Sequence, residues 1–172
     1  MEELYCVVAT YALNESKKVP FFKGTVLSVH NYETKGKVNG NVESSDKNVP
    51  SGLCARLPDA NVTGELLVAP CFLPNALAGP YWIVAYGTDK STGEYTWGVI
   101  SGGAPTVHYD DGCTTKETGV NGSGLWIITR EKIAPGDVVG EARAALKALG
   151  YTLQRLKPVA QDGCTYEGFF IK

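Results

Sequence analysis

The 172-residue sequence lacks several patterns that would assign it to a functional class. No apolar run approaches the ~20 residues that a transmembrane helix requires, which argues against a helical membrane protein. Its 16 basic and 18 acidic residues give a net charge of −2 without a basic stripe, which argues against nucleic-acid binding. The five cysteines include no Cys-x-x-Cys pair, which argues against a zinc ribbon or a thioredoxin-type site.

Histidine is also scarce, with only His30 and His108 in the chain. His108 lies close to Asp110 and Asp111 in the sequence, and such a group could hold a metal or supply a general base. No further ligand follows at a metal-site spacing and no nucleophile stands beside the histidine. We therefore expect a solvated loop histidine, no catalytic residue and no metal.

The N-terminal residues Met1 to Cys6 show neither the positively charged region nor the apolar region of a signal peptide. Three glycosylation sequons begin at Asn14, Asn61 and Asn121, all in predicted turns that would tolerate a glycan. We therefore expect an oxidising compartment, either the secretory pathway and extracellular space or an organelle lumen such as that of the thylakoid. A leader would have been removed during maturation.

Strand-forming runs dominate the rest of the chain. Three runs rich in aromatic and β-branched residues hold all three tryptophans, at 80–86, 95–100 and 125–130. Other strands are expected at 5–13, 25–32, 52–57, 65–72 and 152–159, with a weak one at 38–42. The polar stretch 102–124 is expected to be a long loop.

One amphipathic helix is predicted after the last central run. Pro135-Gly-Asp137 opens it, Gly150 ends it, and an apolar stripe runs along it: Val138, Ala142, Ala145, Leu146 and Leu149. About eight strands at hairpin spacing, followed by this helix and one strand, predict an antiparallel barrel rather than a doubly wound sheet. A barrel of that size encloses packed side chains or one small ligand.

Four segments resemble the lipocalin family in their order and spacing, most closely its apolipoprotein D and bacterial lipocalin branch. They are residues 6–13, 79–89 and 124–130 and the helix that ends in Leu149-Gly-Tyr151. The resemblance implies an all-β fold with one helix: an up-and-down lipocalin-like barrel over residues 1–164, a C-terminal α-helix packed outside it, and a tail at 165–172. The family's first Gly-x-Trp signature is absent before Cys6.

Individual positions carry over from the family pattern. Thr88 and Asp89 resemble the second lipocalin signature, a turn at the closed end of the barrel. Arg130 resembles the third-signature arginine, which in lipocalins packs across a tryptophan at the barrel base. The resemblance also implies a disulfide between Cys6 and Cys164.

Three other cysteines remain: Cys54, Cys71 and Cys113. Cys54 and Cys71 lie about equally far from the turn at 59–64, and in a lipocalin Cys113 would also lie near the open mouth. One further disulfide is expected among these three, which would leave one thiol.

The resemblance implies that inward-facing strand positions line a calyx that binds and carries or sequesters a small hydrophobic ligand, such as a lipid, sterol, retinoid or carotenoid. No cofactor is expected other than such a bound lipid or pigment. Because strand residues alternate between two faces, each aromatic residue has a comparable chance of facing outward. The residues expected to line the calyx are Tyr11, Val29, Leu67, Phe72, Trp82, Trp97 and Trp126.

Two other functions remain open at this point. One is an assembly subunit of a larger complex, built on a lipocalin scaffold. The other is a lipocalin-type enzyme that acts on a carotenoid or lipid, since violaxanthin de-epoxidase is similar to carriers in fold. The tail residues Phe169, Phe170 and Ile171 could dock on a membrane surface or on another protein.

Overall fold

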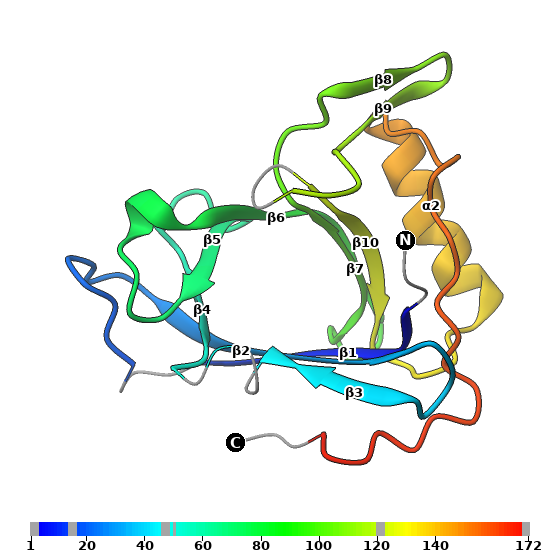
Figure 1. Cartoon of the computed structure of the whole chain (residues 1–172). Helices are drawn as coiled ribbons and strands as arrows, with labels where there is room; N and C mark the ends of the chain where they lie inside the picture. Colours follow the sequence, from blue (N-terminus) through cyan, green and yellow to red (C-terminus); the bar gives the residue numbers. More distant parts are fainter. Residues whose placement is uncertain (1–3, 14–16, 46–48, 50, 120–122, 170–172) are drawn as a thin grey trace. The chain divides into compact units, whose positions relative to one another are not determined.

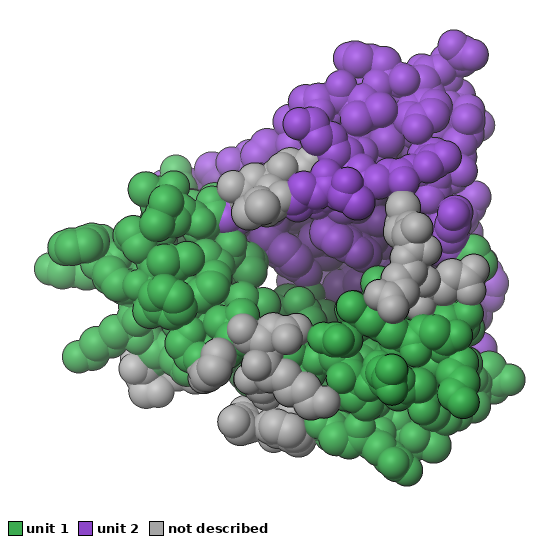
Figure 2. Space-filling view, in the orientation of Figure 1, with its two compact units in different colours: residues 1–60, 67–78, 158–172 green, residues 61–66, 79–157 purple. Residues whose placement is uncertain are grey.

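The computed structural model describes residues 4–13, 17–45, 49, 51–119 and 123–169. This part of the chain contains ten β-strands, one α-helix and a short 3-10 helix (Figure 1). It divides into two compact units, coloured separately in Figure 2. Unit 1 comprises residues 1–60, 67–78 and 158–172, and unit 2 comprises residues 61–66 and 79–157.

Unit 1 is built around its longest strand pair. Strand β2 pairs antiparallel with β1 along one edge, and with both β3 and β4 along the other. Strand β4 pairs in turn with β5. The elements are β1 (Leu4–Leu13), β2 (Val26–Lys35), β3 (Asn41–Ser44), β4 (Leu53–Arg56), β5 (Glu65–Pro70, which begins in unit 2) and the 3-10 helix η1 (Asn75–Leu77).

Unit 2 has β7 at its centre, paired antiparallel with β6 on one side and β10 on the other. Strands β8 and β9 form a separate hairpin. The elements are β6 (Gly79–Thr88), β7 (Tyr95–Ser101), β8 (Val107–Tyr109), β9 (Gly112–Thr114), β10 (Leu125–Thr129) and α2 (Gly136–Ala148).

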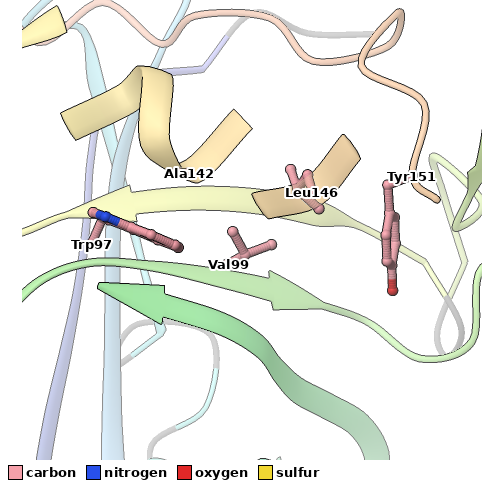
Figure 3. Close-up of a cluster of buried hydrophobic side chains, with 5 residues drawn as sticks. All are labelled: Trp97, Val99, Ala142, Leu146 and Tyr151. Atoms are coloured by element: carbon pink, nitrogen blue, oxygen red, sulfur yellow. The ribbon is translucent and has the colours of Figure 1, made fainter. Parts of the chain in front are cut away.

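The core of unit 2 forms where α2 lies against β7. Trp97 and Val99 point at the helix and meet Ala142 and Leu146, with Tyr151 at the end of the cluster (Figure 3). The Trp97 ring fits against β6 because residue 87 is a glycine. A Cβ on Gly87 would lie only 2.1 Å from the Nε1 atom of Trp97. Burial of these apolar side chains is the main force that holds the helix on the strands.

Unit 1 has two smaller buried clusters, each centred on a disulfide. The Cys6–Cys164 bridge packs with Tyr32, and the Cys54–Cys71 bridge packs with Val19 and Val26. The first bridge joins β1 to the C-terminal segment, as the resemblance implies. The second leaves Cys113 as a free thiol.

The predicted class, mostly antiparallel β with one helix, is confirmed, and α2 lies where the apolar stripe predicts it. The prediction of a strand over 152–159 was wrong, since these residues contain one turn, at Gln154 and Arg155, and no strand. Pro158 has no N–H to donate, and Thr152 N already donates to Cys113 O. The expected loop at 102–124 contains the β8–β9 hairpin instead. No helix in the described segments is long and apolar enough to span a bilayer.

Removal of either disulfide should lower the stability of the protein, by a different amount in each case. Cys6 and Cys164 are 158 residues apart, whereas Cys54 and Cys71 are 17 apart. If loop-closure entropy dominates, Cys6→Ala/Cys164→Ala should lower the free energy of unfolding by about 5 kcal/mol and Cys54→Ala/Cys71→Ala by about 3 kcal/mol. Urea denaturation of both double variants checks this order. A larger loss in the second variant would contradict it.

Candidate functional site

In unit 2, strand alternation gives the β6–β7–β10 ladder two different faces. One face carries Trp97 and Val99, which α2 covers, and Trp97 retains only 7% of its surface exposed. The indole Nε1 of Trp97 also donates a hydrogen bond to Glu141 Oε2 at 3.2 Å. We call this the helix-covered face. Trp97 is fully engaged there as a core residue.

The opposite face, which we call the Trp126 face, carries an apolar row across three strands. Ile100 of β7 pairs with Ile83 on β6 and with Trp126 on β10. Trp126 keeps 46% of its surface exposed, although it lies in a central run of the sequence. Its ring lies over Gly124, where a Cβ would be 1.9 Å from the ring.

A second row on the Trp126 face has a gap at its centre. Tyr86 and Ile128 are both paired with Gly98, which has no side chain. A Cβ placed on Gly98 would meet only the Ile128 side chain, at an ordinary contact distance of 3.7 Å. The face therefore has the exposed Tyr86 on one side and the partly buried Ile128 on the other side of a position that can accommodate another apolar group.

Unit 1 also has a face lined by apolar side chains, which we call the Tyr11 face. Its first row joins Tyr11, Val29 and Leu53 across β1, β2 and β4, and its second row joins Leu13, Leu27 and Ala55. Val29 and Ala55 are buried, whereas Tyr11 and Leu13 are exposed. The residues of this face belong to three strands and contain no charged side chain.

The seven residues expected to line a calyx do not share one face. Tyr11 and Val29 lie on the Tyr11 face, and Trp126 lies on the Trp126 face. Trp82 pairs with Ser101 and is therefore on the helix-covered face, as Trp97 is. Leu67 pairs with Arg56 and is therefore on the face opposite the Tyr11 face. Phe72 follows β5 in a turn and is exposed.

Arg56 is a notable residue that the sequence reasoning missed. Its side chain is completely buried, and its Nη2 donates to the carbonyl oxygens of Pro70 at 2.8 Å and Leu73 at 2.9 Å. Its Nε and Nη1 atoms have no acceptor among the described residues. Burial lowers the pKa of this guanidinium. The only sequence signal is a charged residue within the otherwise apolar run 53–57.

The residues implied as structural lie near the ends of β6 and β10. Asp89 follows β6 and its Oδ1 accepts hydrogen bonds from the Ser91 hydroxyl, Ser91 N and Thr92 N. Thr88, the last residue of β6, is exposed beside it. Arg130 is also exposed, and its Nε donates to Tyr95 O at 3.3 Å.

The histidine and acid group gives no metal site in the described part of the chain, where no set of three or more His, Cys, Asp or Glu residues could hold an ion. His108 and Cys113 pair across the β8–β9 hairpin, with 3.2 Å between Nδ1 and Sγ. Asp111 accepts a hydrogen bond from Gln154 at 2.9 Å. His30 lies on β2, partly buried.

The tail residue Phe169 packs edge-to-face against Tyr32, with ring centroids 6.0 Å apart. Burial raises the pKa of Tyr32, as does the nearby charge of Glu167. The two other tail residues considered for docking, Phe170 and Ile171, lie outside the described residues. The sequons at Asn14 and Asn121 also fall at least partly outside them, whereas Asn61 is exposed in a turn.

Comparison with known proteins does not assign this chain to a family, since neither the known family models nor the curated proteins give a match.

Asp89 predicts a specific pH dependence of stability. Hydrogen bonds from the Ser91 hydroxyl, Ser91 N and Thr92 N favour the ionised form and hold the pKa of Asp89 below its usual range. The stabilisation is thus present above the ordinary aspartate pKa of about 4 and is lost as pH falls through the lowered value of the folded state. Asp89→Asn should lower the urea midpoint at pH 7 but leave it unchanged in strong acid.

Urea titrations of both proteins across the acid range measure this effect, and Ser91→Ala, which removes one donor, should reproduce part of it. An equal loss at neutral and acid pH would show that Asp89 acts through geometry alone.

Proposed function

We propose that this protein binds and carries or sequesters a small hydrophobic ligand, such as a lipid, sterol, retinoid or carotenoid, in the calyx of a lipocalin-like barrel. The observation that carries this proposal is the apolar row on the Trp126 face, in which Ile83 and Trp126 are exposed on either side of the buried Ile100. A protein that only needed a core would cover such a row with its own side chains.

The proposed mode of action is burial of the ligand rather than chemistry. A ligand that covers a few hundred Å² of apolar surface would gain several kcal/mol at ~25 cal/mol per Å². Micromolar or tighter binding remains after the entropy costs of association. Gly98 contributes space on the Trp126 face, and Trp126 contributes a large flat contact that suits an extended or polycyclic ligand.

The lipocalin-like architecture is supported by the order of the elements and by the resemblance of the segments named above. An antiparallel strand series is followed by one helix that packs on a strand face. The Cys6–Cys164 bridge and the Asp89 turn stand at the positions that the resemblance implies. The two disulfides are compatible with an oxidising extracellular or luminal compartment.

An assembly subunit is the alternative function. The Tyr11 and Trp126 faces would then bind a partner protein instead of a small molecule, and the barrel would serve as a scaffold. The two functions predict different results with a free lipid. A ligand carrier should bind the lipid on the Trp126 face, whereas an assembly subunit should bind a partner protein there instead.

The proposal predicts that Trp126 contacts the ligand and Trp97 does not. Dibromostearate, whose bromine atoms quench tryptophan only near contact, should quench the protein saturably, and stearate should compete. Trp126→Phe should lose most of this quenching. Trp97→Phe should keep it, because the Trp97 ring is enclosed by α2. Equal quenching in the two variants would contradict the assignment of Trp126.

Gly98→Val tests the space on the Trp126 face. Valine suits a strand, and its Cβ would touch only Ile128, so the fold should be retained. Its methyl groups should weaken dibromostearate binding about tenfold, which corresponds to about 1.4 kcal/mol. Gly140→Ala is the matched control, since a Cβ there has no neighbour within 4 Å. Unchanged affinity in Gly98→Val would count against the proposed ligand site.

A further inference from the structure

Unit 1 presents exposed apolar side chains on two neighbouring loops. Phe21 is fully exposed on the loop between β1 and β2, and Phe72 and Leu77 are 62% and 63% exposed in the segment after β5. Both loops lie on the same side of unit 1 in Figure 1. Unit 1 itself does not cover these large apolar side chains. Exposed apolar groups of this kind mark a surface that contacts another molecule.

The backbone directs Phe21 outward. Its φ is +60°, a left-handed conformation that a bulky side chain rarely adopts. The next residue, Phe22, turns inward and packs on the cluster around the Cys54–Cys71 disulfide. Gly24 permits this bend, because a Cβ there would lie 2.5 Å from the Phe22 ring. The loop thus has one buried and one exposed phenylalanine, at the cost of a strained backbone.

The same cluster holds both loops in place. Val19 of the first loop packs with Cys71, which begins the second loop. The buried Arg56 binds the carbonyl oxygens of Pro70 and Leu73, on either side of Phe72 in the sequence. Lys17 Nζ donates to Ser51 O at 3.0 Å and fixes the start of the first loop. The apolar side chains are therefore presented by anchored loops.

The charged residues that these two loops contain are of one sign. The segment 17–24 contains Lys17, Lys18 and Lys23, and the segment 71–78 has no charged residue. Neither segment contains an acidic residue. Lys18 and Lys23 are exposed on either side of Phe21. Aromatic side chains flanked by lysines suit the boundary of an anionic bilayer, where rings enter the headgroup region and ammonium groups contact lipid phosphates and carboxylates.

We propose that the loops bearing Phe21 and Phe72 dock the protein on the surface of an anionic phospholipid bilayer. Phe21, Phe72 and Leu77 enter the headgroup region, while Lys18 and Lys23 supply the electrostatic attraction. The docking residues belong to unit 1 and the Trp126 face to unit 2, and this inference goes beyond ligand carriage. It gives a hydrophobic ligand carrier a place to exchange its ligand with a membrane.

The test is co-sedimentation of the full chain with vesicles of phosphatidylcholine, with and without phosphatidylserine. We expect binding only to the phosphatidylserine vesicles, with an affinity that falls as salt is added. Phe21→Gly should weaken vesicle binding at least tenfold, because the aromatic ring is lost. Glycine adopts positive φ readily, so this variant should keep the thermal midpoint of the parent or raise it.

Two further variants sharpen the result. Lys18→Glu/Lys23→Glu should abolish the preference for phosphatidylserine. Ile133→Ser, which removes an exposed apolar side chain from unit 2, is the matched control and should bind as the parent does. Phe21→Gly should also keep dibromostearate quenching, so that failure of docking and failure of ligand carriage are told apart. Absence of binding to anionic vesicles, or equal binding by the parent and Phe21→Gly, would overturn the proposal.

Discussion

The alternation of side chains along β7 is the constraint on which the structure of unit 2 depends. It sends Trp97 and Val99 to one face of the ladder and Gly98 and Ile100 to the other. Helix α2 has a single apolar stripe, so it can cover only one of these faces. The apolar row that includes Trp126 is left without a cover from this helix. The proposed ligand site follows from this unequal coverage of an apolar ladder.

Unit 1 follows the same principle with different means. The C-terminal segment, tied by Cys6–Cys164, packs on Tyr32, and the β1–β2 loop packs on the Cys54–Cys71 cluster. The Tyr11 face is on the other side of β2. In unit 1, segments held by disulfides therefore pack on one side of the strands, as α2 does in unit 2. The loops that cover the cluster also expose Phe21 and Phe72, which links the packing of the unit to its proposed docking surface.

Much of the architecture could be predicted because it depends on local pattern. The central strands and the helix carry clear periodicities, and the resemblance implied the Cys6–Cys164 bridge. The orientation of individual aromatics could not be predicted, since a register shift between Ile83 and Ala85 changes which β6 residues face α2. The burial of Arg56 depends on carbonyl groups 14 and 17 residues away, and such distant contacts leave no local pattern.

The central claim is that a small apolar molecule occupies the face that α2 does not cover. Native mass spectrometry of the protein purified from its source, followed by denaturing extraction, tests it most directly. If the ligand is bound as proposed, the spectrum should show a mass excess of one small molecule per chain, and extraction should recover a stoichiometric lipid, sterol, retinoid or carotenoid. A bare chain mass with nothing extractable, in a protein that also fails to bind added fatty acids, retinoids and carotenoids, would contradict it and favour the assembly subunit.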